Sequence, residues 1–198
     1  MKQALTYLLF LVLSFDTIAL EKKAFEKQAL EKQALEKQAL ISPSYENIIH
    51  RSQESIDQAH IVQALIYEDP SNQLLLNDLI QKSDNAWKPV SGDYAVYGFS
   101  DSAYWVKFKV KNASDEMLQE VLSISYPMLD RIDFYRLSAQ GIHSRFTTGD
   151  IFPKDSRPLT SRYFAFPIDL QPQEETEIFL RIASEGTINI PMSLWNRD

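Results

Sequence analysis

The segment that most constrains the fold of this chain is residues 102–112, Ser-Ala-Tyr-Trp-Val-Lys-Phe-Lys-Val-Lys-Asn, because side chains of two kinds alternate along it. A period of two predicts a β-strand, whose successive side chains point to opposite faces. The opposite face would carry Trp105, Lys107 and two further lysines. The core face would carry four apolar or aromatic side chains, Tyr104, Val106, Phe108 and Val110.

Two interpretations of Trp105 are open. An outward tryptophan beside basic groups can serve as a ligand platform, through stacking and cation–π contact. Alternatively, a neighbouring loop buries Trp105 and the lysines are only solvated, since isolated apolar residues on an outer face are common.

The N-terminus has the features of a secretory signal peptide over residues 1–19. Lys2 supplies a positive start, Leu5 to Phe15 is an apolar run, and Thr17-Ile18-Ala19 offers small residues for cleavage. The run is too short to span a bilayer comfortably. We therefore expect an exported protein.

Residues 20–41 form a low-complexity spacer in which Glu-Lys-Gln-Ala-Leu occurs three times, at 26–30, 31–35 and 36–40. These residues favour a helix. A five-residue period advances the leucines by about 140° per copy, so no single apolar stripe forms. A semi-rigid spacer is a better interpretation than a coiled coil.

The charge balance and the cysteine count limit the function class. From Ile41 onward there are 14 Lys and Arg against 22 Asp and Glu, and the whole chain contains no cysteine. An acidic body argues against nucleic-acid binding. An exported domain without disulfides fits the bacterial periplasm better than a eukaryotic exterior.

The remaining chain predicts an all-β fold with a short N-terminal extension. Residues 42–58 are expected to be a short helical or irregular extension, and residues 59–196 a single domain. Eight short strands separated by turn signals indicate a jelly-roll β-sandwich. The expected strands are 93–99, 103–111, 118–126, 130–137, 141–147, 160–168, 175–183 and 187–195, with a further strand within 60–68 and a helical turn within 74–82.

Several of these strands place a basic residue next to an aromatic residue on the face opposite the expected core. One outer face would then be concave, aromatic and basic. The candidate ligand-binding residues are Trp105, Lys107, Tyr135, Arg157, Arg162 and Arg181.

The order and spacing of several short motifs resemble a known family. They are Gly98, Ala103-x-Trp105-x-Lys107, Asn112, Pro127-Met-Leu-Asp130-x-Ile-Asp133-x-Tyr135, Gly149-Asp150-x-Phe-Pro153, Arg157, Arg162, Phe166-Pro167, Phe179-Leu-Arg181 and Pro191-x-x-Leu194. From about His60 to Trp195 the chain resembles the type 2 extracellular sensor domain of bacterial seven-transmembrane receptors with diverse intracellular signalling modules.

The resemblance implies a jelly roll similar to carbohydrate-binding modules, located in the periplasm. It also implies a following membrane region and a cytoplasmic output such as a histidine kinase or a diguanylate cyclase. The chain departs from the family in two respects. Lys107 stands where the family has arginine, which keeps the charge but loses the bidentate fork. The sequence stops at Asp198, so it is either a fragment of a receptor or a free-standing sensory subunit.

No catalytic constellation is visible. The histidines, His50, His60 and His143, lack metal-ligand spacing, and there is no Gly-x-Ser-x-Gly motif. We expect no catalytic residue and no cofactor, although a structural calcium held by loop carboxylates is open. The loop carboxylates considered for calcium are Asp93, Asp101, Asp115 and Asp150.

Arg157 also has two interpretations. It can tie down a long loop through a bidentate pair with Asp150, or it can contact a ligand directly.

Three functions remain, each from a different class. The first is a ligand-sensing domain that binds a saccharide or another small molecule. The second is a dimerisation module that works as a homodimer without a ligand. The third, a carbohydrate-active enzyme, is disfavoured because Asp130 and Asp133 would point to opposite faces of one strand.

Overall fold

The computed structural model describes residues 48–51, 59–60, 64–90 and 95–197, all of which belong to one compact unit, Asn47–Asp198. The predicted signal peptide and spacer lie outside the described residues, as does most of the predicted extension.

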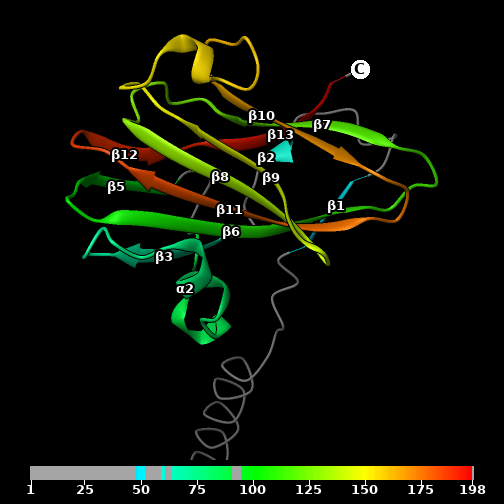
Figure 1. Cartoon of the computed structure of the whole chain (residues 1–198), viewed down its shortest axis with the longest axis horizontal. Helices are drawn as coiled ribbons and strands as arrows, with labels where there is room; N and C mark the ends of the chain where they lie inside the picture. The colour runs from blue at the N-terminus through cyan, green and yellow to red at the C-terminus, as the bar shows by residue number, and fades with distance from the viewer. Residues whose placement is uncertain (1–47, 52–58, 61–63, 91–94, 198) are drawn as a thin grey trace, which may run out of the picture. The chain divides into compact units, whose positions relative to one another are not determined.

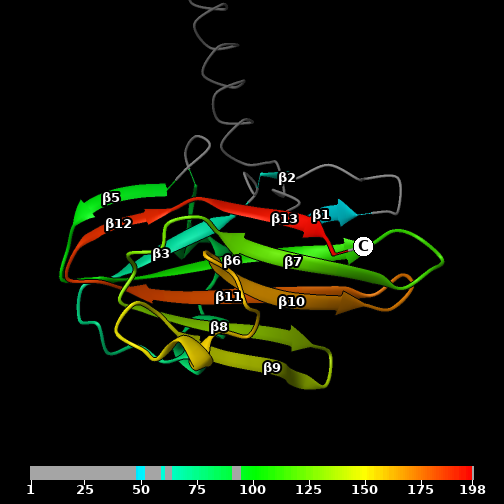
Figure 2. The same cartoon turned by 90° about the horizontal axis from the view of Figure 1, so that it is seen from above.

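The domain is a β-sandwich (Figures 1 and 2), which confirms the predicted fold class. The larger sheet has seven strands in the order β4-β3-β6-β11-β8-β9, with β1 also paired to β6. These strands are β1 (Ile48–Arg51), β3 (Leu65–Asp69), β4 (Lys88–Pro89), β6 (Ala103–Asn112), β8 (Arg131–Ser138), β9 (Gly141–Thr148) and β11 (Glu175–Ala183).

The opposing layer consists of a four-stranded sheet and a two-stranded ribbon. The sheet has the order β10-β7-β13-β2, and the ribbon pairs β12 with β5. Their bounds are β2 (Ala59–His60), β5 (Ala95–Phe99), β7 (Leu118–Ile124), β10 (Phe164–Leu170), β12 (Thr187–Ile190) and β13 (Met192–Asn196). The helical elements are short: α2 (Leu76–Ile80), η1 (Asp84–Ala86) and η2 (Lys154–Ser156).

The connections between the sheets follow a jelly-roll pattern. The chain passes from β6 to β7 and later from β10 to β11, and in both cases it changes sheet. Because β11 pairs with β6 and β10 pairs with β7, the two crossings run side by side. This is how a jelly roll closes two antiparallel sheets over one core.

The alternating apolar residues fill the space between the sheets, as the sequence predicts. Strand β6 contributes Val106, Phe108 and Val110, and strand β11 contributes Ile178, Leu180 and Ile182 to the same cluster. From the opposing layer come Leu122, Ile124, Phe164 and Phe166, all fully buried. Burying these side chains is the main stabilising term of the domain.

A buried ion pair joins the two layers at one end. Arg51 on β1 donates from Nε to Oε1 of Glu120 on β7 at 2.9 Å, and from Nη2 to Oε2 at 3.2 Å. Both side chains are nearly inaccessible to solvent. A bidentate contact of this kind fixes geometry, and loss of one partner would leave an uncompensated buried charge.

Residues 42–58 were expected to be helical or irregular, and this prediction is wrong for Ile48–Arg51. These residues form β1 and pair in parallel with Lys109 to Asn112 of β6. Isoleucines at positions 48 and 49 favour a strand, and a free edge of β6 was available to accept it. A second boundary is also shifted. The strand expected from residue 160 begins only at Phe164, because residues 160–163 belong to a loop.

Gly149 is required by a close backbone contact. Its φ angle is +150°, and a Cβ atom added there would lie 1.9 Å from the carbonyl oxygen of Asp130. The amide of the next residue, Asp150, donates to the carbonyl oxygen of Leu129 at 2.8 Å, so the two loops are held together.

We expect Gly149→Ala to lower the free energy of unfolding by about 3 kcal/mol or more, because the backbone of residues 130–131 must move. Gly141→Ala is the matched control, since its φ angle of +115° is also unfavourable but no atom lies within 4 Å of the added Cβ. Urea unfolding measures both variants. Equal losses would mean that backbone strain, and not the contact with Asp130, makes Gly149 necessary.

Candidate functional site

The outer face of the larger sheet is covered by residues 70–87, here termed the covering segment. It includes α2 and η1 and lies beneath the sheet in Figure 1. Leu76, Leu79 and Trp87 from this segment pack on Trp105, Tyr135 and Phe179 from the sheet. Trp105 is 0% exposed, and its ring stacks on that of Tyr135 at 6.2 Å between centroids.

Lys107 and Arg181 hold the covering segment in place. Lys107 donates from Nζ to Oδ1 of Asp84 at 2.5 Å and lies 4.5 Å from the centre of the Trp87 ring. Arg181 donates from Nη2 to the carbonyl oxygen of Asn72 at 3.1 Å, and also to the side chain of Asn72. Both predicted site residues therefore have structural partners.

Asp69 fixes the start of the covering segment. It accepts hydrogen bonds from the Ser71 amide and hydroxyl and from the Leu74 amide. Burial opposes ionisation, but the hydrogen bonds from the Ser71 hydroxyl and from the backbone amides outweigh it and lower the pKa of Asp69. The carboxylate is ionised at neutral pH and holds the turn that leads into α2.

The prediction of an exposed aromatic and basic platform is therefore wrong for Trp105, and the alternative in which a neighbouring segment buries it is correct. The reason lies outside the strand. The leucines of the covering segment need an apolar partner, and the outer face of β6, β8 and β11 supplies it.

We expect Trp105→Ala to lower the free energy of unfolding by about 3–5 kcal/mol, because it removes a fully buried indole from a packed cluster. Phe99→Ala is the control, since Phe99 is 81% exposed and its truncation should change stability by less than about 0.5 kcal/mol. Thermal and urea unfolding test this. A Trp105→Ala variant as stable as Phe99→Ala would contradict the burial of the indole.

Arg157 and Arg162 lie apart from this face, in the loop between β9 and β10. Arg157 donates from Nη1 to the carbonyl oxygen of Ser161 at 2.9 Å, and its guanidinium lies 4.8 Å from the centre of the Phe164 ring. It thus ties the loop down, but through a carbonyl group and not through the expected pair with Asp150. Arg162 is exposed and lies over the ring of Tyr163.

The six predicted site residues consequently do not form one site. Trp105, Tyr135, Lys107 and Arg181 belong to the contact with the covering segment, and the two loop arginines belong to another part of the molecule. Their role in ligand binding stays a prediction.

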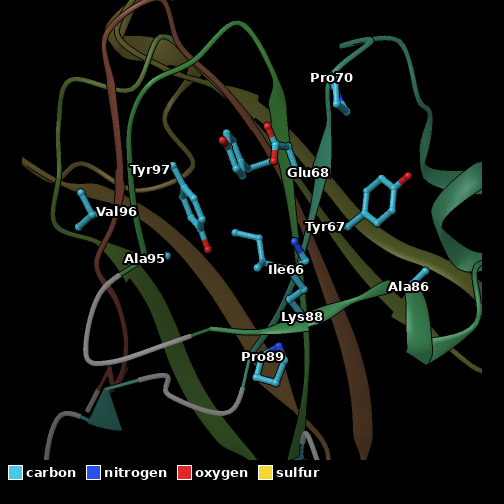
Figure 3. A pocket seen from close by; sticks show the side chains of 11 residues that line it. Ile66, Tyr67, Glu68, Pro70, Ala86, Lys88, Pro89, Ala95, Val96 and Tyr97 are labelled. Atoms are coloured by element: carbon cyan, nitrogen blue, oxygen red, sulfur yellow. The ribbon is translucent and has the colours of Figure 1, made fainter.

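A pocket of about 630 Å³ opens at the edge of the sandwich, between β3, β4 and β5 (Figure 3). Ile66 and Ala95 line its apolar part, while Glu68, Lys88 and Tyr97 bring polar groups. In Figure 3, Glu68 from β3 and Tyr97 from β5 point toward the same space, whereas Tyr67 points away toward α2.

Two stacked tyrosines form one wall of this pocket. The rings of Tyr97 and Tyr104 lie 4.3 Å apart at an interplanar angle of 24°. Burial, followed by the nearby Tyr104 and the carboxylate of Glu68, raises the pKa of Tyr97 above its usual value. The Tyr97 hydroxyl therefore remains protonated at neutral pH and can donate a hydrogen bond.

The charged groups of the pocket come from β3 and β4. Ser102 donates from its hydroxyl to Oε1 of Glu68 at 2.8 Å, which orients the carboxylate. Lys88 lies on the two-residue strand β4 and is exposed. The pocket thus offers an acceptor, a cationic donor, a phenolic donor and an aromatic wall, a combination suited to a small polar molecule.

Sequence reasoning did not identify this pocket. It assigned Tyr104 to the core face of β6, which is correct, and it gave Tyr97 no role. Glu68 and Tyr104 are opposite each other in the β3–β6 register, but that pairing is not visible in a single sequence.

No group of three or more His, Asp or Glu side chains that could hold a metal ion occurs among the described residues. Of the carboxylates considered for calcium, Asp93 lies outside the described part of the chain. Within that part, no helix is long and apolar enough to cross a membrane.

The architecture is that of an all-β sandwich domain, and a comparison with family models identifies the family. The model described as 7TMR-DISM extracellular 2 matches residues 63–196, which is most of the chain. The chain belongs to this family, which confirms the resemblance to the type 2 extracellular sensor domains of seven-transmembrane receptors. It is an exported sensor module of that receptor class.

A comparison with curated proteins finds no match. Among solved structures, a GH31 α-xylosidase from Xanthomonas citri is similar, with 12% sequence identity and a TM-score of 0.29. The alignment covers 68% of this chain but only 15% of the enzyme. A likeness this low carries no argument about this domain.

Proposed function

We propose that this chain is the periplasmic ligand-sensing domain of a bacterial membrane receptor, and that the pocket between β3, β4 and β5 binds a saccharide or another small polar molecule. The observation that carries the proposal is the stacked pair Tyr97–Tyr104 beside the oriented carboxylate of Glu68 in one pocket.

The dimensions and lining of the pocket support this function. Its volume of about 630 Å³ lies in the range of small-molecule sites. The apolar part can take the carbon skeleton of a sugar ring against the tyrosine wall. Glu68 can accept hydrogen bonds from sugar hydroxyl groups, and Lys88 and Tyr97 can donate to sugar oxygens.

The role of the domain in a receptor rests on the family. In that setting a membrane region follows the sensor domain, and a histidine kinase or diguanylate cyclase provides the output. Among the described residues that line the pocket, Glu68 is the one carboxylate, whereas a glycosidase typically uses a pair of carboxylates.

A second candidate function is ligand-independent dimerisation. The observation that favours it is the exposure of two apolar side chains on β5, Val96 at 59% and Phe99 at 81%. Sedimentation velocity over a range of protein concentrations tests it, with Phe99→Ser as the variant that should weaken association.

The ligand proposal is tested by thermal-shift screening of the whole chain against neutral sugars, sugar acids and amino acids, followed by calorimetric titration of each hit. Binding of the folded state raises the melting temperature even when the affinity is modest. We expect Tyr97→Ala to weaken the binding of the hit about tenfold, or roughly 1.4 kcal/mol.

Tyr126→Ala is the matched control, since Tyr126 is also a half-buried tyrosine packed on the core but is not part of the pocket lining. Its affinity should equal that of the wild type. If Tyr97→Ala binds the hit as tightly as Tyr126→Ala, the pocket is not the binding site. If no compound of the panel raises the melting temperature, the result favours ligand-independent dimerisation.

A further inference from the structure

The loop between β9 and β10 contains a second pocket, of about 700 Å³. It is lined by Lys154, Arg157 and Arg162, by one carboxylate, Asp155, and by the hydroxyl groups of Thr160 and Ser161. It shares no residue with the tyrosine-lined pocket, and Figure 1 shows its loop, which includes η2, on the other side of the sandwich from α2.

The charge of this pocket is opposite to that of the chain. The whole chain has a formal net charge of −7, yet three cations gather here around a single acid. Seven other lysine and arginine side chains of the described residues form ion pairs with carboxylates. Within the same described part, none of the three pocket cations does.

Arg157 is held in position before any ligand arrives. Its Nη1 donates to the carbonyl oxygen of Ser161 at 2.9 Å, and its guanidinium lies 4.8 Å from the centre of the Phe164 ring, which is fully buried. Nη1 also donates to the carbonyl oxygen of Arg162 at 3.4 Å. A guanidinium has five N–H donors, and these two bonds use the two on Nη1. Three donors, on Nε and Nη2, remain on a group that has already lost much of its conformational freedom, so binding an anion costs little ordering.

Arg162 contributes a second guanidinium group to the pocket. It is exposed, and its guanidinium lies 5.0 Å from the centre of the Tyr163 ring, a contact that limits its motion. Planar guanidinium groups match carboxylate and phosphate oxygens in two-point contacts. The hydroxyl groups of Thr160 and Ser161 can add neutral donors to the same anion.

We propose that this pocket binds the anionic group, a carboxylate or a phosphate, of a small solute. Arg162 and Lys154 supply the accessible charges, and Arg157 supplies the fixed one. The site is independent of the tyrosine-lined pocket, so its failure leaves the function proposed above unaffected.

The test uses the whole chain and compares glucuronate with glucose, which differ at one carboxylate, and adds inorganic phosphate as a second anion. Calorimetric titration at low ionic strength should show glucuronate or phosphate binding at least about tenfold more tightly than glucose. The affinity should fall as salt is added, since the contacts are charged and partly exposed.

The variant is Arg162→Gln. We expect it to bind glucuronate or phosphate about tenfold more weakly than the wild type, because it loses one charge-assisted contact. Arg145→Gln is a matched control, because Arg145 is also exposed and also lies over a tyrosine ring, that of Tyr135 at 5.3 Å, but it is outside the pocket. Its affinity for anions should equal that of the wild type.

Three results would overturn the proposal. The first is equal binding of glucose and both anions. The second is an equal effect of Arg162→Gln and Arg145→Gln, which would indicate a general charge effect. The third is glucuronate binding that Tyr97→Ala weakens and Arg162→Gln does not, which would place the sugar acid in the other pocket. Binding of phosphate alone, lost in Arg162→Gln, supports the site and assigns it to phosphate groups.

Discussion

The structure depends on the burial of Trp105 between the larger sheet and residues 70–87. Its ring packs with Tyr135 and Phe179 on the outer face of the sheet, so strands β6 and β11 are buried on both faces. One face supports the sandwich core, and the other supports the covering segment. Two polar interactions flank this apolar contact, the hydrogen bond from Lys107 to Asp84 and the hydrogen bond from Arg181 to Asn72.

The covering segment closes the face of the larger sheet that carries Trp105. Among the described residues, one pocket lies where β3 and β4 approach β5, with an aromatic wall and both signs of charge. Another lies in the loop that contains η2 and is basic in an acidic protein. Jelly rolls position such loops and edges on a rigid scaffold, which suits a sensor.

Much of the fold could be predicted because period-two alternation is local. Strand β6 was expected at residues 103–111 and is found at Ala103–Asn112, and β11 has the expected bounds of Glu175–Ala183. The site could not be predicted in the same way. Whether Trp105 is exposed depends on leucines about 30 residues earlier in the chain, and the meeting of Glu68 with Tyr104 depends on strand register. The charges of Lys107 and Arg181 are visible in the sequence, but their partners, Asp84 and Asn72, belong to a segment whose path the alternation does not specify.

We propose that ligand sensing takes place at the pocket between β3, β4 and β5 and not on the face that carries Trp105. The most direct measurement is amide chemical-shift mapping by NMR of the ¹⁵N-labelled chain during titration with a saccharide hit. We expect the shifts to concentrate at Glu68, Lys88 and residues 95–97, with little change at Trp105, Tyr135 and Phe179. Shifts centred on those three aromatics would show that the ligand displaces the covering segment and binds the face beneath it, and not the edge pocket.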